Sequence, residues 1–202
     1  MTLLELVIVL GLLSLIMAIF VPTMSAVQRG FERQSDRSQS NDQARLAVEE
    51  LDREIRSGNV LYDPSLENDP ADGVYPGMSL RIYSQTNAPS RNPGFQCVQW
   101  RVVTGQLERR DWSVDWRSDN NVSPWRIVAD HIVNQPSPPN PPVKPVFSLD
   151  PDPNKGGRTI IVTLMVNENP VNGQTVQLQE SITGRNTEYG YPNNVCNDIP
   201  PY

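Results

Sequence analysis

The sequence predicts an α+β protein in which a long N-terminal helix, part transmembrane and part stalk, packs against a mainly antiparallel β-sheet head. Three observations support this prediction: an uncharged run from Leu6 to Val21, a helical apolar stripe over residues 44–55, and alternating apolar residues in several segments after residue 78. They divide the 202-residue chain into a hydrophobic and stalk helix over 1–57 and a globular β-rich head over 58–202.

Composition restricts the partners of the chain. The net charge of −6 argues against general binding to nucleic acid or to anionic membrane surfaces. The 19 prolines and 12 glycines predict many loops and short strands in the head.

The N-terminal run has the length of a membrane span. Together with the first four residues, the segment from Leu6 to Val21 reaches the ~20 apolar residues that a bilayer core requires. Glu5 interrupts it, and an unpaired carboxylate in hydrocarbon costs several kcal/mol, so we expect Glu5 to have a partner. The nearest cation is an N-terminal amine, and a neighbouring subunit's amine is at least as well placed as its own.

Two simpler interpretations compete with this one. A secretory signal peptide has a basic start and a small-residue cleavage site, but this chain has no Lys or Arg before Arg29 and no clean cleavage pattern. A plain N-terminal anchor stays open, although it does not explain Glu5.

The residues Thr2, Leu3 and Glu5 and the apolar run ending in Pro22 resemble the mature N-terminus of type IV pilins and type II secretion pseudopilins. Met1 stands where that family usually carries Phe. The resemblance implies that a prepilin peptidase removes a leader, that Met1 is then methylated, and that the numbering is that of a processed chain. It also implies roles for Thr2, Glu5 and Pro22 in filament assembly, with unwinding just before Pro22 when subunits pack.

The family resemblance also implies a location, partners and a function. The chain is expected in the inner membrane through its single helix, then in an extracellular or periplasmic filament with other pilins and the assembly machinery, without nucleic acid. The leading hypothesis is a structural subunit of a type IV pilus or pilus-like filament. The alternatives are a minor pseudopilin of a type II secretion system and a tip adhesin or DNA-uptake minor pilin with a basic patch of Arg81, Arg101, Arg109 and Arg110.

The stalk helix continues beyond Pro22. Residues Ala44, Ala47, Val48, Leu51 and Ile55 form one apolar stripe, and Gly58 suits the left-handed position after a helix. The predicted helix is about 80 Å long, with a kink or a broken hydrogen bond at Pro22. Residues 31–43 are polar all round and run either between subunits or as a free spacer. Residues 44–56 resemble the stalk end in the branch of minor pilins and pseudopilins that includes PilW and GspJ.

In the head, a loop-rich connection over 58–78 precedes the strands. The pattern predicts strands over 79–84, 95–103, 106–112, 146–149, 159–166 and 175–183, with a tight turn at Thr104-Gly105, Val114 and Trp116 continuing the sheet, and 159–166 as the central strand. It also predicts a helical turn and a strand start within 125–133, an extended proline-rich loop over 135–145 and a hairpin loop at Asn172-Gly173.

The two cysteines, Cys97 and Cys196, predict one disulfide in an exported chain, with two free buried thiols as the alternative. A bond between them would close a loop of about 100 residues, for which chain-entropy models give roughly 4 to 5 kcal/mol.

Catalytic and metal-binding patterns are not recognisable in the sequence. It shows no nucleophile, phosphate-loop or dinucleotide motif, so we expect no catalytic residue, no cofactor and no enzyme activity. The single histidine, His131, lies beside apolar residues and favours a structural role, so no metal site is predicted there. The segment 150–157 places oxygen ligands at alternate positions but departs from a calcium loop, which favours an ordinary acidic turn.

Overall fold

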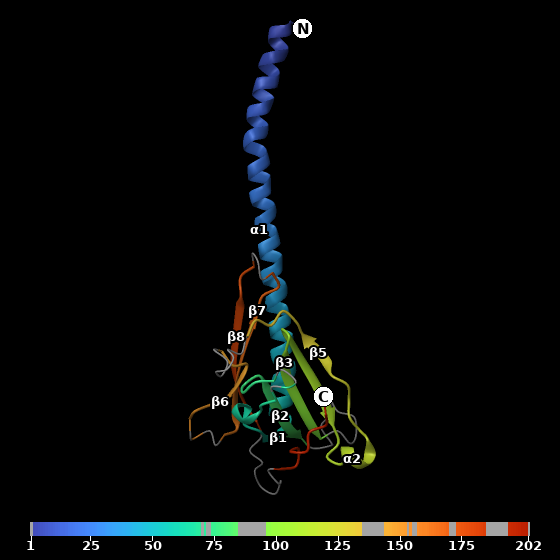
Figure 1. Cartoon of the computed structure of the whole chain (residues 1–202). Coiled ribbons are helices and arrows are strands. Elements are labelled where there is room, and N and C mark those ends of the chain that lie inside the picture. The colour runs from blue at the N-terminus through green and yellow to red at the C-terminus, as the bar shows by residue number, and fades with distance from the viewer. Residues whose placement is uncertain are drawn as a thin grey trace.

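The computed structural model describes residues 2–69, 71, 74–84, 96–134, 144–152, 154, 157–169, 173–184 and 194–201. Helix α1 (Leu3–Ser57) is continuous over 55 residues, and the head surrounds only its C-terminal part (Figure 1). The predicted fold class is confirmed, because a long apolar N-terminal helix packs against antiparallel sheets.

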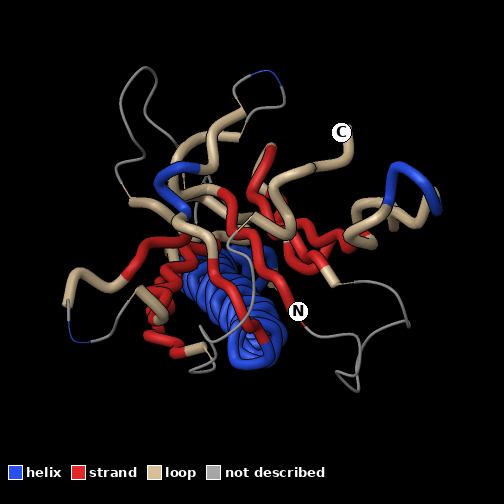
Figure 2. Tube along the Cα trace, turned by 90° about the horizontal axis from the view of Figure 1, so that it is seen from below, coloured by secondary structure: helices blue, strands red, loops and turns tan. Residues whose placement is uncertain are grey.

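Two antiparallel sheets build the head. Five strands pair in chain order, namely β1 (Gly58–Leu61), β2 (Ser79–Ser84), β3 (Cys97–Val103), β4 (Gln106–Trp112) and β5 (Arg126–Ala129). Three more form the second sheet, β6 (Phe147–Leu149), β7 (Thr159–Val166) and β8 (Val176–Thr183). Two short helices, η1 (Pro64–Leu66) and α2 (Trp116–Asp119), lie in the connections. Figure 2 looks nearly along α1 and shows strands flanking it.

The local signals for strands and turns are largely confirmed. Thr104 and Gly105 both have positive φ, 50° and 78°, as a two-residue hairpin turn between β3 and β4 requires. Strand β7 pairs with β6 on one side and β8 on the other, so it is central as predicted. Its alternate residues are buried because they face the helix and the core.

The apolar stripe of the stalk is the centre of this core. All five of its residues are buried, and they join a single cluster with residues of both sheets, among them Trp100 and Phe147. The predicted stripe is therefore confirmed, and the helix supplies a core that the two sheets share.

The predicted left-handed conformation of Gly58 is wrong. Gly58 has φ −67° and ψ 132°, which is extended, and the chain passes directly from α1 into β1. The position needs glycine for another reason, since a Cβ atom there would lie 2.7 Å from Cγ2 of Ile82 on β2. The connection over 58–78 accordingly contains a strand and a 3-10 turn as well as loops.

Two other head predictions are also wrong. Val114 and Trp116 do not extend the sheet, because the chain turns at Asp115, whose N–H bonds Ser113 Oγ and whose carbonyl accepts from Ser118 N–H. The helical turn predicted within 125–133 is absent, whereas the strand start predicted in the same segment is confirmed, because β5 pairs with the outer edge of β4.

Several predicted features lie outside the described residues. They are the start of the 95–103 strand before Gln96, the proline-rich positions 135–143 and the loop residues 170–172. In the acidic turn, Asp152 N–H donates to Asp150 Oδ1 and Asn154 N–H donates to Asp152 Oδ1. These carboxylates thus cap their own backbone, as an acidic turn does.

The shared core gives a direct test on the helix. Leu51 is fully buried against both sheets, whereas Leu46 on the same helix is 66% exposed. We expect Leu51→Ala to lower the free energy of unfolding by about 2–5 kcal/mol, and Leu46→Ala to change it by less than about 0.5 kcal/mol. Urea unfolding of the detergent-solubilised chain, followed by tryptophan fluorescence, measures both; equal losses would contradict this description of the core.

Candidate functional site

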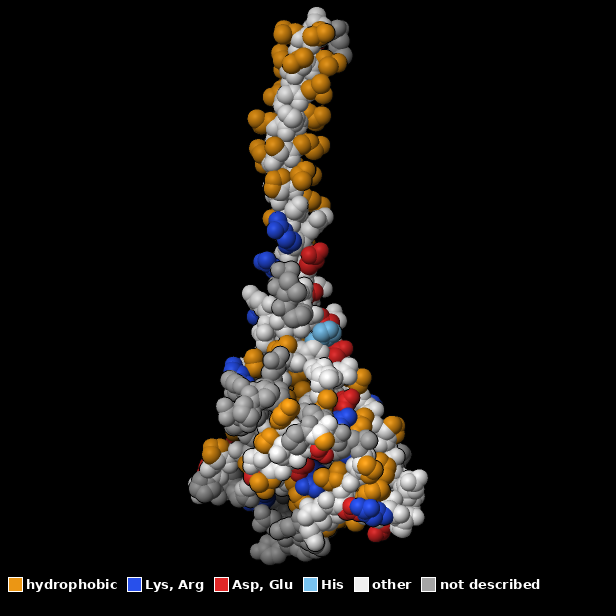
Figure 3. Space-filling view, viewed as in Figure 1, with side chains coloured by type: hydrophobic (Ala, Val, Ile, Leu, Met, Phe, Trp, Pro, Cys, Tyr) orange, Lys and Arg blue, Asp and Glu red, His pale blue; other side chains and the backbone are white. Residues whose placement is uncertain are grey.

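The N-terminal half of α1 projects from the head with no protein cover. All side chains over residues 2–24 are exposed in the single chain, and the most apolar 18-residue window has a mean hydropathy of 2.8. On the face seen in Figure 3, apolar side chains surround this part of the helix and the charged side chains in view lie nearer the head. Glu5 in the first turn is the one charged residue of the apolar segment. By length and composition the helix is long and apolar enough to cross a membrane.

Thr2 and Glu5 form the described start of this helix. Glu5 Oε2 accepts a hydrogen bond of 3.3 Å from the Thr2 N–H, and the Thr2 carbonyl accepts from the N–H groups of Glu5 and Leu6. Within one chain Glu5 therefore caps its own helix. Met1, the expected site of methylation, lies outside the described residues.

Pro22 lies inside the helix without interrupting it. Residue 22 has no N–H to offer to the Ala18 carbonyl. Two nearby hydroxyls make additional bonds to other helix carbonyls: Thr23 Oγ1 donates to the Ile19 carbonyl at 2.7 Å and Ser25 Oγ to the Val21 carbonyl at 3.0 Å. The unwinding before Pro22 that the resemblance implies is not present in the single chain, where this segment is helical.

The polar part of α1 contacts the head where the helix leaves it. Side chains over 26–35 are exposed, whereas Asp36 is half-buried and accepts from Asn169 Nδ2 at 3.3 Å. Gln39 Nε2 donates to Glu168 Oε1 at 2.6 Å, and buried Ser40 accepts from the Glu168 N–H. Residues 36–40 therefore belong to a stalk–head junction, with residues 167–169 after β7 on its other side.

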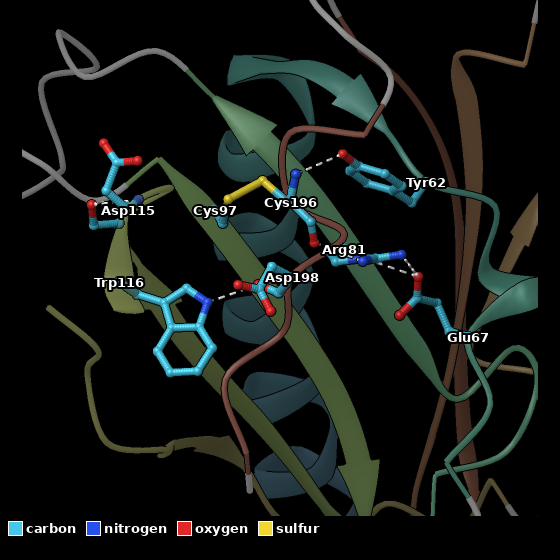
Figure 4. The surroundings of a disulfide bond; sticks show 9 residues. Tyr62, Glu67, Arg81, Cys97, Asp115, Trp116, Cys196 and Asp198 are labelled. Atoms are coloured by element: carbon cyan, nitrogen blue, oxygen red, sulfur yellow. Dashed lines mark hydrogen bonds and ion pairs between the residues drawn. A yellow bond between two sulfur atoms is a disulfide. The ribbon is translucent and has the colours of Figure 1, made fainter. Parts of the chain in front are cut away.

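The C-terminal segment 194–201, here called the tail, lies across the outer face of the five-stranded sheet (Figure 4). Cys196 forms a disulfide with Cys97 on β3. Tyr62 Oη accepts from the Cys196 N–H at 3.0 Å, and Arg81 donates to the Cys196 carbonyl at 2.7 Å. Further along, Arg117 pairs with both carboxylate oxygens of Asp198. The disulfide is thus one of several contacts that hold the tail.

A buried ion pair underlies the tail. Arg81 Nη2 lies 2.7 Å from Glu67 Oε1, and both side chains are almost fully buried. Burial raises the pKa of Glu67, and the charge of Arg81 only partly opposes this rise. Burial likewise raises the pKa of Tyr62, although its bond from the Cys196 N–H acts in the opposite direction.

The four arginines proposed as a basic patch do not form one. Arg109 points to the helix and pairs with Glu54. The other three lie on the outer face, where Arg81 pairs with Glu67 and Arg101 with Glu108, while Arg110 is buried and donates to Gln99 and to tail carbonyls. Their charges are used within the head, so this feature gives no support to a surface for DNA.

No protein-family model matches the chain, and a search of curated proteins finds no match either.

Two groups of residues were not predicted from the sequence. The tail contacts of Arg117 and Asp198 join positions 81 residues apart, and Glu168 approaches His131 from another strand connection. Neither pair has a local spacing signal, because folding brings together positions that are distant in sequence.

The raised pKa of Glu67 predicts a pH dependence. The folded chain holds a proton on Glu67 more tightly than the unfolded chain does. The contribution of Glu67 to the free energy of unfolding is therefore most favourable at low pH. It declines as the pH rises above about 4, the usual pKa of glutamate. We expect the free energy of unfolding of Glu67→Gln, relative to wild type, to shift in favour of the variant between pH 4 and pH 7.

Asp198→Asn serves as the control of opposite sign. The hydrogen bond from Arg117 lowers the pKa of Asp198, so this variant should lose stability relative to wild type over the acidic range as the pH rises. The loss should be small because the pair is exposed to solvent. A Glu67→Gln difference that stays constant with pH would contradict the assignment.

Proposed function

We propose that this chain is a structural subunit of a pilus-like filament, of the type IV pilin and pseudopilin kind. One observation carries the proposal: a single helix has an apolar, uncovered surface with one carboxylate in its first turn, and its other end is the core of a folded head. Before assembly this helix would lie in the membrane, and after assembly it would pack against the same helix of other subunits.

The environment of Glu5 supports association between subunits more than a helix that only anchors the chain in a membrane. An apolar anchor has no use for a carboxylate, since its charge is costly in hydrocarbon. Within the described chain, Glu5 accepts a hydrogen bond of 3.3 Å from the neutral N–H group of Thr2. A neighbouring subunit's N-terminal amine offers a full positive charge, and such charge-assisted pairs are roughly twice as strong as neutral hydrogen bonds. Association would therefore give the carboxylate a stronger partner than the Thr2 N–H.

The shape of the molecule is consistent with this arrangement. At 1.5 Å per residue, the uncovered apolar segment is about 30 Å long. The head is confined to the far end of the helix (Figure 1). Packing of the uncovered segments side by side would place the heads outside a helical core.

Substitution of Glu5 tests the proposal. We expect Glu5→Ala and Glu5→Gln to be made and inserted in the membrane, and to lower the yield of filaments by at least about tenfold, a loss equivalent to about 1.4 kcal/mol. Glu5→Gln is the informative variant, because Gln can still cap the helix start but has no charge. Filament yield is measured by shearing cells and quantifying the released chain against the membrane-bound chain.

The two variants separate charge from capping. Assembly restored by Gln but not by Ala would assign Glu5 to helix capping and remove the charge-pairing argument. Normal yield from both would contradict the proposal. As a matched control, Glu32→Gln alters an exposed carboxylate beyond the apolar segment and should assemble normally.

Sheared fibres also distinguish a pilus from a secretion pseudopilus. Abundant recovery of this chain in extracellular fibres, with a methylated Met1 by mass spectrometry, is expected of a main pilus subunit. Recovery only from the membrane at low copy would identify a minor pilin or pseudopilin.

A further inference from the structure

Three potential metal ligands meet at the stalk–head junction. Nδ1 of His131 lies 3.0 Å from Asp130 Oδ1 and 2.9 Å from Glu168 Oε2, and all three atoms are within 4.8 Å of one another. Asp130 and His131 directly follow β5, whereas Glu168 follows β7. The two connections are held side by side by the bridge between Ile132 and Val166 and by the bond from the Asn167 N–H to the His131 carbonyl.

Hydrogen bonds within the described chain do not satisfy both carboxylates of the cluster formed by Asp130, His131 and Glu168. One imidazole nitrogen carries at most one hydrogen, yet two carboxylate oxygens lie at contact distance from it. Glu168 Oε2 is fully buried and accepts no hydrogen bond of acceptable geometry within the described chain. A buried carboxylate oxygen is costly unless a donor or a cation faces it. A cation bound between His131 Nδ1, Asp130 Oδ1 and Glu168 Oε2 would attract both carboxylate oxygens and would also face the buried Glu168 Oε2.

The separations fit a coordination sphere. Zinc bonds to imidazole nitrogen and carboxylate oxygen are about 2.0–2.2 Å long. Adjacent ligands at such distances are about 3.0 Å apart at right angles and about 3.4 Å apart in a tetrahedron. The contacts of 2.9 and 3.0 Å match neighbouring positions at right angles around one ion.

Stalk residues hold Glu168 in place by hydrogen bonds. Glu168 Oε1 accepts from Gln39 Nε2 of the stalk, and the Glu168 N–H donates to Ser40 Oγ. Hydrogen bonds to a side chain that ligates a metal orient that side chain and strengthen metal binding.

We propose that Asp130, His131 and Glu168 bind a divalent transition-metal ion of the zinc class, with water in the open positions. One nitrogen and two carboxylate oxygens suit such an ion, whereas magnesium and calcium prefer oxygen ligands alone. The ion ties the connection after β5 to the connection after β7 and, through Glu168 and Gln39, to α1 where the helix leaves the head. Its role is to fix the head on the stalk, which is separate from the proposed pairing at Glu5.

The test uses the full chain in detergent after removal of metal by a chelator. Zinc is titrated in competition with a chromophoric chelator, and cobalt is added separately for its visible spectrum. We expect one zinc ion per chain, a rise in the melting temperature with zinc, and a cobalt spectrum of a nitrogen- and oxygen-ligated site.

Two variants remove ligands with little disturbance of the fold. His131 has φ +56°, a conformation that Asn accepts more readily than most residues, so His131→Asn is preferable to Ala. Glu168→Gln keeps an acceptor for Gln39. Each should weaken zinc binding by at least tenfold, whereas Asp152→Asn in the acidic turn should leave the affinity unchanged.

Other results would overturn the site. A wild-type chain that binds no zinc at millimolar concentration would show that the cluster is an ion pair between an imidazolium and two carboxylates. Zinc affinity unchanged in both His131→Asn and Glu168→Gln would place the bound metal elsewhere.

Discussion

The burial of one helix stripe between two sheets is the interaction on which the structure depends. Each sheet has an apolar face, and both faces pack around Leu51 and its neighbours on α1. Leu51 and Ile55 are fully buried, so the inward side of the last turns of the helix belongs to the core of the head. Removal of the helix would leave both sheets with an exposed apolar face, so the stalk cannot be regarded as an addition to a finished domain.

The same helix therefore works in two environments. Its C-terminal part is covered by its own sheets, whereas its N-terminal part has an apolar surface that the chain itself does not cover. Apolar surface of this extent in water is unfavourable by about 25 cal/mol per Å², so a bilayer or other helices must cover it. Because α1 is continuous, whatever holds its first turns also sets the position of the head.

Features that depend on residues close in sequence could be predicted, whereas features that depend on distant contacts could not. The apolar stripe, the strand β7 and the turn at Thr104-Gly105 depend on residues close in sequence, so periodicity and turn chemistry predicted them. The contacts of Glu168 with His131 and of Arg117 with Asp198 join segments that are distant in sequence, which no local pattern records. The prediction for Gly58 was wrong for a different reason, because this position requires space beside Ile82 and not a left-handed backbone.

Polar contacts and a disulfide add to this core at two further places, the tail and the stalk–head junction, and they have different consequences. The tail closes the outer face through the disulfide and the contacts of Arg81, so it stabilises the head without touching the stalk. Residues 167–169 instead bond the stalk at Asp36, Gln39 and Ser40, where the helix leaves the head. A change in the tail therefore alters stability, whereas a change at the junction alters how firmly the head follows the helix. In an assembly built on that helix, only the second would affect the arrangement of neighbouring heads while each remained folded.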